Sequence, residues 1–216
     1  MQLQTLTTPR LTLRPLRPSD SAAVFAYRSD PAVARFQMWE PSSEAEVHTF
    51  IEGLQDLELD TPDTWYQLAI TLRDNGILIG DCGLHFPREE PHQVEVGITL
   101  APAHQGQGYA TEALEGMMEF LFVNLGKHRV VASVDPRNEP STALLERVGM
   151  RKEGHLRESV WVKGEWADDA IYAILEREWR LRQLSSAPSR PANRESVNRA
   201  SVPKSGGSAR TKCRTI

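Results

Sequence analysis

The alternation of apolar and polar residues predicts strands at both ends of the chain and a strand–helix–strand–helix middle. Leu11 to Arg14 alternates apolar and charged side chains, which is typical of a strand with one buried face. Apolar runs predict further strands at residues 65–72, 77–86, 94–100, 128–134, 153–162 and 166–174. Apolar residues at helical spacing predict helices within residues 19–26, 43–54, 110–126 and 140–149, and a short one through Trp179. This order predicts one mixed α/β domain over residues 1–184.

The last part of the chain has a different composition. Residues 185–216 are rich in Ser, Pro, Gly and Arg, and they carry seven cations against one anion, a charge of +7 − 1 = +6. We expect this basic tail to be disordered, because it cannot bury enough apolar surface to offset its ordering entropy. A basic arm that contacts RNA or another polyanion is the alternative. The formal charge of −4 for the whole chain then leaves −10 on the rest, which favours a cationic substrate such as an amine only in a general way.

Several classes of protein are not expected. No stretch approaches the roughly 18 apolar residues that span a bilayer. The first residues lack a basic segment followed by an apolar one, so no secretory leader is predicted. Cys82 and Cys213 lie far apart, and the His residues are scattered, so neither a disulfide framework nor a metal site is expected. We expect Cys82 to be a buried thiol and the location to be the reducing cytoplasm.

The segment EVGITLAPAHQGQGYATEAL, residues 95–114, carries the strongest chemical signal. Pro102 ends a strand, and a glycine-rich loop then leads into a helix. Gly106 and Gly108 lack a Cβ atom, so a ligand can approach the backbone closely. The N–H groups of the first helical turn form an anion site that the helix dipole strengthens. The loop is neither a Walker loop nor a dinucleotide fingerprint. It therefore predicts a phosphate-bearing cofactor, with a structural turn as the alternative.

The same loop resembles the acetyl-CoA pyrophosphate loop of the GNAT acetyltransferase superfamily, written Gln/Arg-x-x-Gly-x-Gly/Ala. Gln105, Gly108 and Ala110 occupy its specified positions. Four other segments resemble the RimJ/RimL-type branch in the same order, namely TPRLTLRPLRPSD, ILIGDCGL, DPRNEPSTALLERVGMRKEG and YAILEREW, and GYATEAL extends the loop. The similarity covers roughly residues 8–180. Five separated blocks in the right order are far more specific than one loop.

The resemblance implies an α+β GNAT fold, in which a seven-stranded mixed sheet with flanking helices splays apart between its fourth and fifth strands. It implies that acetyl-CoA is the cosubstrate, that no metal is required, and that the pantetheine arm pairs with the fourth strand, residues 94–100. A homodimer is implied by the resemblance alone. The residues expected to hold the cofactor are Ile98, Thr99, Leu100, Gln105, Gly106, Gln107, Gly108, Tyr109, Ala110, Asn138 and Ser141.

Two residues are candidates for proton transfer. Direct attack of an amine on the thioester requires a neutral amine, and the departing thiolate requires a proton. Glu95 lies three residues before Ile98, and we interpret it as the base, acting directly or through water; a solvated strand carboxylate is the alternative. Many GNAT members use a Tyr as the acid at the position where this chain has Leu145. RimJ/RimL-type enzymes use the Ser of Asn-x-x-Ser, so Ser141 of Asn138–Ser141 is expected to protonate the sulfur, with helix capping as the alternative.

The sequence thus indicates an N-acetyltransferase that moves an acetyl group from acetyl-CoA to a primary amine. Within the branch, the resemblance allows protein N-termini, including those of ribosomal proteins. It also allows small amines such as polyamines and aminoglycosides, which form the first alternative. A CoA-binding regulatory module without turnover and an RNA-binding protein that uses the basic tail are the others. Four tryptophans are interpreted as core, with a place in the acceptor pocket as the alternative: Trp39, Trp65, Trp161 and Trp166.

Overall fold

The computed structural model describes residues 5–186, so nearly all of the basic tail, with its predicted disorder and RNA binding, lies outside the described residues. The strands are β1 (Leu6–Thr7), β2 (Leu11–Pro15), β3 (Thr64–Leu72), β4 (Leu78–Phe86), β5 (Gln93–Leu100), β6 (Arg129–Val134), β7 (Arg151–Val162) and β8 (Glu165–Leu175). The helices are α1 (Ser21–Arg28), α2 (Pro31–Ala34), α3 (Glu44–Gly53), α4 (Tyr109–Glu119), α5 (Glu139–Arg147) and α6 (Glu176–Ser186). Shorter turns are η1 (Pro18–Asp20), η2 (Pro102–His104) and the π turn η3 (Phe120–Asn124).

One mixed sheet organises these elements. Its strand order is β1-β2-β3-β4-β5-β6-β8-β7, and every neighbouring pair is antiparallel except β5 and β6, which are parallel. The seven predicted strands are all present, and the described residues add an eighth, the two-residue β1. Two residues are too few to show a hydrophobic period, which is why the sequence pattern did not predict β1.

β5 and β6 separate partway along their length. Their pairing covers three positions and ends where Glu95 lies opposite Val131. β5 nevertheless stays paired with β4 as far as Leu100, and β6 stays paired with β8 as far as Val134. The second half of β5 and that of β6 therefore each have one edge without a neighbouring strand. This is the predicted splay between the fourth and fifth strands of the family pattern, and it is confirmed.

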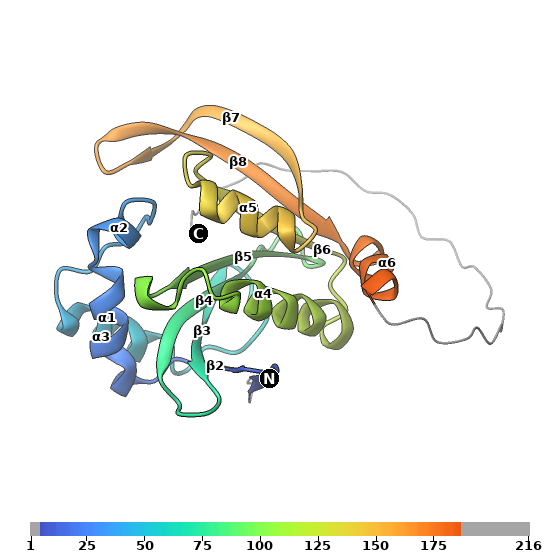
Figure 1. Ribbon diagram of the computed structural model, residues 1–216. Coiled ribbons are helices and arrows are strands. Elements are labelled where there is room, and N and C mark those ends of the chain that lie inside the picture. Colours follow the sequence, from blue (N-terminus) through green and yellow to red (C-terminus); the bar gives the residue numbers. More distant parts are fainter. Residues whose placement is uncertain (1–4, 187–216) are drawn as a thin grey trace.

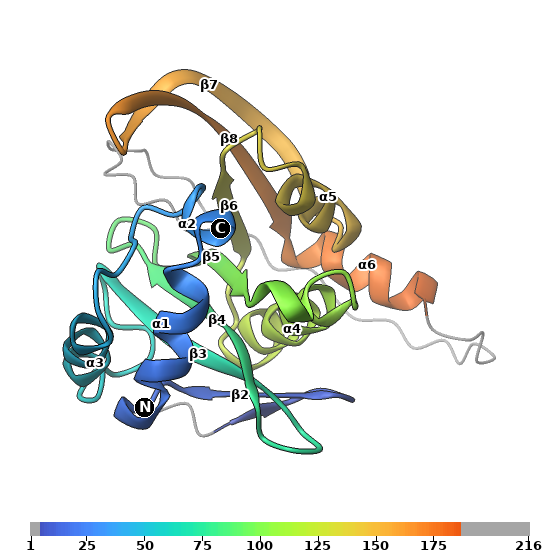
Figure 2. The same cartoon turned by 60° about the vertical axis from the view of Figure 1, so that its left-hand side comes forward.

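Helices cover both faces of the sheet (Figures 1 and 2). Leu68 and Ile70 belong to the larger core, together with the buried face of α4, whose side chains recur at helical spacing: Ala113, Leu114, Met117 and Met118. Ala69 lies between those two strand residues and packs with Val24 of α1 and Ile51 of α3 in the second core. Because successive strand residues point to opposite faces, α4 and the pair α1 and α3 lie on opposite faces.

The β7–β8 hairpin arches away from the sheet, and its tip extends toward α2 (Figures 1 and 2). The turn at the tip uses Lys163 and Gly164, with φ values of 48° and 86°. Such paired left-handed residues match the twist of a two-residue hairpin. The Lys163 Nζ donates to the carbonyl of Ala34 at 2.9 Å and pairs with the carboxylate of Glu40. These two contacts connect the tip of the hairpin to the α2 segment, which lies on the other side of the split.

Two local departures from regular geometry occur in β4 and at the end of α4. A Cβ added to Gly80 would lie 2.2 Å from the carbonyl oxygen of Thr99, so the backbones of β4 and β5 approach closely there. The helix predicted over residues 110–126 is α4 continued by η3, and Gly126 follows with a φ of 63°. No helix within residues 5–186 is both long enough and apolar enough to cross a membrane.

Candidate active site

The loop between β5 and α4 has the open backbone that its glycines predicted. Gly106 and Gly108 have φ values of 71° and 80°, a conformation that residues with a side chain rarely adopt. Gly108 is the N-cap of α4, and as a glycine it has no side chain that could accept a hydrogen bond from the N–H groups of the first turn. Gln105 Nε2 donates to the carbonyl of Leu100 at 2.9 Å, so the loop is tied to the end of β5. Because the N-cap supplies no side chain to cap them, the N–H groups in the first turn of α4 are suited to bind an anion.

The side chain of Arg10 contacts this loop and the first residue of α4. The Arg10 guanidinium lies 4.5 Å from the ring centroid of Tyr109, and its Nη1 donates to the carbonyl of Gln107 at 3.1 Å. Its Nε also pairs with Glu112 in the first turn of α4 at 2.6 Å. Burial raises the pKa of Glu112, but hydrogen bonds from Thr8 and Arg10 lower it further than burial raises it. Arg10 thus neutralises the one carboxylate in the first turn of α4, which would otherwise repel a diphosphate.

The sequence patterns gave no role to Arg10 or Glu112, although both lie within blocks that carried the family resemblance. The two are 102 positions apart in the chain. Only the folded sheet brings them together, so no local spacing could have predicted the pair.

The free edge of β5 presents backbone groups to the split. Ala101 donates its N–H to the carbonyl of Ile79 at 2.8 Å, so odd-numbered residues of β5 face β4. Backbone groups alternate in direction along a strand, and those of Ile98 and the N–H of Leu100 therefore point into the split. The carbonyl of Leu100 accepts from the Gln105 side chain instead. A cofactor arm can use Ile98 as the predicted pairing position, and at Leu100 the N–H is directed into the split while the carbonyl already accepts one hydrogen bond.

A cleft of about 1250 Å³ passes through this region. Its lining includes Phe36 and Gln37 from the α2 side of the sheet, and Gly108 and Ser141 from the α4 side. The cleft therefore runs through the sheet where β5 and β6 separate. Nearly all predicted cofactor residues line it: Ile98, Thr99, Leu100, Gln105, Gly106, Gly108, Tyr109, Ala110, Asn138 and Ser141. Gln107 does not; its side chain donates to the carbonyl of Ala103.

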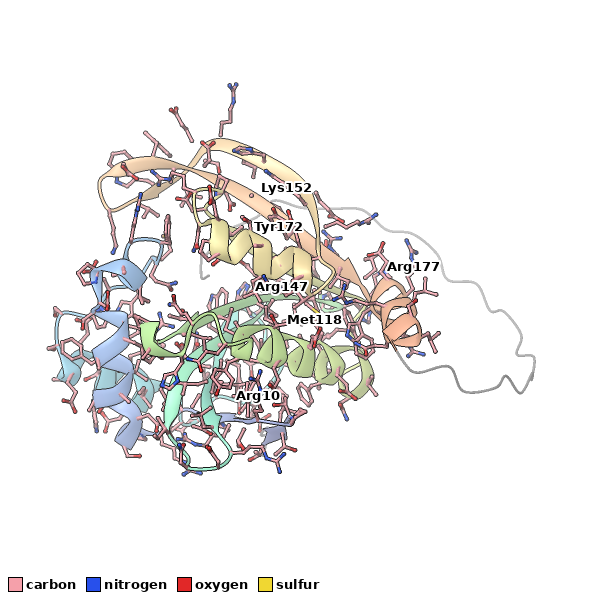
Figure 3. All side chains as sticks on the ribbon, in the orientation of Figure 1. Arg10, Met118, Arg147, Lys152, Tyr172 and Arg177 are labelled. Atoms are coloured by element: carbon pink, nitrogen blue, oxygen red, sulfur yellow. The ribbon has the colours of Figure 1, made fainter. Side chains whose placement is uncertain are left out.

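Two of the arginines that line the cleft are labelled in Figure 3. Arg147, at the end of α5, and Arg10 lie on opposite sides of α4 in this view, and both line the cleft. The cleft is also lined by the carboxylates of Glu112, Glu115 and Glu119, so the feature that favours a polyanionic cofactor is the N-terminus of α4 rather than a surplus of basic side chains.

Ser141 lies in the first turn of α5 and lines the cleft. The N-cap of α5 is Asn138, whose Oδ1 accepts from the N–H of Ser141 at 3.4 Å. The interpretation of Ser141 as a cap is therefore wrong, because Asn138 performs that role. Within the described residues, no hydrogen bond of the Ser141 hydroxyl is present, so the group is available to a molecule in the cleft.

Glu95 lies on the opposite side of the sheet from α4 and does not line the cleft. It is the last residue of β5 that pairs with β6, so it marks the point where the split begins. Its neighbour on β4 is His85, whose Nδ1 lies 3.9 Å from Glu95 Oε2 and whose ring stacks on Trp65. The Glu95 side chain is 19% exposed, so it is not a fully solvated carboxylate. Burial lowers the pKa of His85, and the charge of Asp63 opposes that effect only in part.

Comparison with known proteins decides the family. Residues 10–151 match the family model described as an acetyltransferase (GNAT) domain. The chain belongs to the GNAT acetyltransferase family. Enzymes of this family take an acetyl group from acetyl-CoA and transfer it to amines. The resemblance to the GNAT family stated from the sequence is confirmed.

Relatives of this GNAT acetyltransferase align over most of their length. The N-acetyltransferase p20 of Bacillus licheniformis is 32% identical over 178 residues, which cover 82% of this chain and 99% of that protein. The [ribosomal protein uS5]-alanine N-acetyltransferase of Escherichia coli strain K12 is 26% identical over 180 residues, which cover 81% and 92%. The crystal structure of a GNAT-family acetyltransferase from Bacillus anthracis has a TM-score of 0.73 and 28% identity, with coverage of 81% and 100%.

Burial and packing test the expectations for Cys82 and for three of the tryptophans in this acetyltransferase. Cys82 is buried, and burial raises the pKa of its thiol well above the usual value, so it stays protonated and is not a nucleophile. Trp39 packs on Phe50 in the second core, as predicted. Trp161 and Trp166 are 56% and 58% exposed, so the interpretation of these two as core is wrong. They lie opposite each other on the two strands of the hairpin that arches away from the sheet.

Proposed function

We propose that this acetyltransferase transfers the acetyl group of acetyl-CoA to the α-amino group of a protein N-terminus, of the type that ribosomal proteins carry. The observation that carries the proposal is the cleft through the β5–β6 split, which joins the glycine loop of α4 to the Ser141 hydroxyl. The acceptor class is supported by the relative that is named as a ribosomal-protein alanine N-acetyltransferase. A domain limit at residue 184, a homodimer and a cytoplasmic location stay predictions.

The residues present fit acetyl-CoA, which would supply the thioester. The backbone of Ile98 is placed to pair with the amides of the pantetheine arm, in the manner of an added strand. The N–H groups of the loop and of the first turn of α4 suit a diphosphate. Gly106 and Gly108 have no side chain, so the backbone there can approach the diphosphate closely. Arg10 removes the local negative charge of Glu112.

Three groups of this chain then serve the transfer. Glu95 accepts the proton that the amine loses, directly or through a water molecule, as the new C–N bond forms. An N–H of β5 that faces the split stabilises the negative charge that develops on the thioester oxygen. The Ser141 hydroxyl delivers a proton to the sulfur as the C–S bond breaks, and it regains a proton from water while Glu95 returns its own to solvent. The base and the acid lie on opposite faces of the sheet, so amine and cofactor would meet in the split from opposite sides.

A thiol-release assay tests this function most simply. The enzyme, acetyl-CoA and a panel of alanine- and serine-initiated peptides, polyamines, aminoglycosides and simple alkylamines are combined, and mass spectrometry locates the acetylated nitrogen. We expect the highest kcat/KM with N-terminal peptides. A preference for small polycations would instead establish the small-amine alternative, and cofactor binding without thiol release from any acceptor would establish a regulatory module.

The Glu95→Gln enzyme tests the base. At pH 7 we expect kcat/KM to fall about 100-fold, because most of the acceptor amine is protonated there and the amide cannot take its proton. The loss should shrink as pH rises, since free amine then becomes abundant without a base. The measurement is kcat/KM from pH 6 to 10, with Glu89→Gln, an exposed residue of the β4–β5 loop, as the matched control. A Glu95→Gln profile identical to that of the control would rule out the role.

A further inference from the structure

A buried polar cluster lies beside the cleft, and the transfer steps above do not use it. Tyr27 donates its hydroxyl to Asp81 Oδ1 at 2.6 Å, and Arg28 Nη2 donates to Asp81 Oδ2 at 2.5 Å. All three side chains are at most 4% exposed. A buried ion pair is weak evidence for stability, since its attraction is offset by the loss of hydration, so another use of Arg28 is worth seeking.

Arg28 orients the amide of Gln37. Its Nη1 donates to Gln37 Oε1 at 3.4 Å. A guanidinium has only donors, so the glutamine must turn its oxygen to Arg28 and its NH₂ group away from it. Burial lowers the pKa of Arg28, but Asp81 and Tyr27 raise it by more, so the guanidinium stays charged and holds this orientation at any physiological pH. Gln37 is 4% exposed and lines the cleft, and its NH₂ is the part left to face a ligand.

The cluster lies under the segment of β5 that borders the split. Asp81 on β4 pairs with Thr99 on β5, and directly opposed residues share a face of the sheet. Glu95 is four positions from Thr99 on the same strand, so it shares this face too. Gln37 therefore enters the cleft from the side on which the proposed base lies, not from the side of the glycine loop and α5. A group bound by Gln37 belongs to the amine acceptor rather than to the cofactor diphosphate.

We propose that the Gln37 amide donates a hydrogen bond to a main-chain carbonyl of the acceptor peptide and so selects peptides over simple alkylamines. This inference rests on the proposed transfer to protein N-termini. The ligand atom must be a hydrogen-bond acceptor, because the Gln37 oxygen already accepts from Arg28 and only the NH₂ group, a donor, faces the ligand. A peptide carries such an oxygen at every residue, and an alkylamine carries none. The apolar cleft residues around Gln37, Ala32, Val33 and Phe36, would leave an unmatched NH₂ without a partner when an alkylamine binds.

Two variants test Gln37. Gln37→Met keeps the size of the side chain without its donors, and Gln37→Glu keeps a partner for Arg28 but presents only acceptors. For each we measure kcat and KM with an alanine-initiated peptide and with a simple alkylamine, and the Kd of acetyl-CoA by calorimetry. We expect the ratio of kcat/KM for the peptide to that for the alkylamine to fall about tenfold in both variants, mainly through KM for the peptide.

Three results would overturn the proposal. An equal loss with both acceptors would mean that Gln37 only supports the fold of α2. A weaker Kd for acetyl-CoA with an unchanged acceptor ratio would place Gln37 on the cofactor. If neither the peptide-to-alkylamine ratio of kcat/KM nor the Kd of acetyl-CoA changed, Gln37 would have no role in binding the acceptor or the cofactor. Failure of the proposed function is visible separately, because it appears in the unsubstituted enzyme as alkylamine turnover without peptide turnover.

Discussion

Replacing Ser141 with alanine is expected to lower kcat about 100-fold. The hydroxyl lines the cleft and makes no hydrogen bond within the described residues, so its loss removes a proton donor without leaving a partner unsatisfied. A thiolate is a better leaving group than an amine, which places the effect at the lower end of general-acid catalysis. The α5 helix keeps its cap, because Asn138 supplies it, and Tm should stay unchanged. Steady-state thiol release and thermal unfolding measure the two effects.

Thr142→Ala is the matched control for Ser141→Ala. Thr142 also carries a hydroxyl in the first turn of α5, but that group donates to the carbonyl of Glu139 at 3.0 Å and the residue does not line the cleft. We expect its kcat to stay within about twofold of the unsubstituted enzyme. If Ser141→Ala kept the same kcat as Thr142→Ala with an intact fold, Ser141 could not be the acid.

Replacing Asp81 with alanine is expected to lower the free energy of unfolding by about 3–5 kcal/mol. Asp81 is 2% exposed and accepts hydrogen bonds from both Tyr27 and Arg28. Without it, Arg28, itself 4% exposed, loses the carboxylate that pairs with its charge. Leaving one charge of a buried pair unmatched costs far more than losing both. Urea unfolding followed by circular dichroism measures the change.

The double variant Arg28→Met/Asp81→Leu separates the charge from the packing. Because it removes both ions and leaves apolar groups, we expect it to be more stable than Asp81→Ala. Arg88→Met provides an external control, since its ion pair with Asp63 lies on the surface, with side chains 66% and 51% exposed. Its loss should be much smaller than that of Asp81→Ala. A double variant as unstable as Asp81→Ala would mean that shape rather than charge dominates.

The sequence predicted the backbone geometry of the glycine loop well because the loop is local. Gly106 and Gly108 adopt their left-handed conformations within a few residues of each other, and the helix that follows begins at Tyr109. The same holds for Ser141, whose place in the first turn of α5 follows from Asn138 and Pro140 nearby. In such segments, residue type and spacing are sufficient to define the backbone and what it presents.

The polar cluster at Asp81 could not be predicted in this way. Arg28 and Asp81 are 53 positions apart, and neither stands in a pattern with Gln37 that a single sequence reveals. The face of Glu95 could have been inferred: it lies three residues from Ile98, and residues an odd number apart on a strand point to opposite faces. The exposure of Trp161 depends on the arch of the β7–β8 hairpin, which no local pattern encodes.

The central claim is that the split in the sheet holds the cofactor, and a crystal structure of the protein with acetyl-CoA tests it most directly. We predict the pantetheine arm hydrogen-bonded to the backbone of Ile98, the diphosphate at the N–H groups from Gly106 to Ala110, since the N–H of Gln105 donates to the carbonyl of Pro102, and the thioester sulfur within hydrogen-bond reach of the Ser141 hydroxyl. Acetyl-CoA bound at another surface, or a sheet in which β5 and β6 stay paired beyond Val131, would contradict the account.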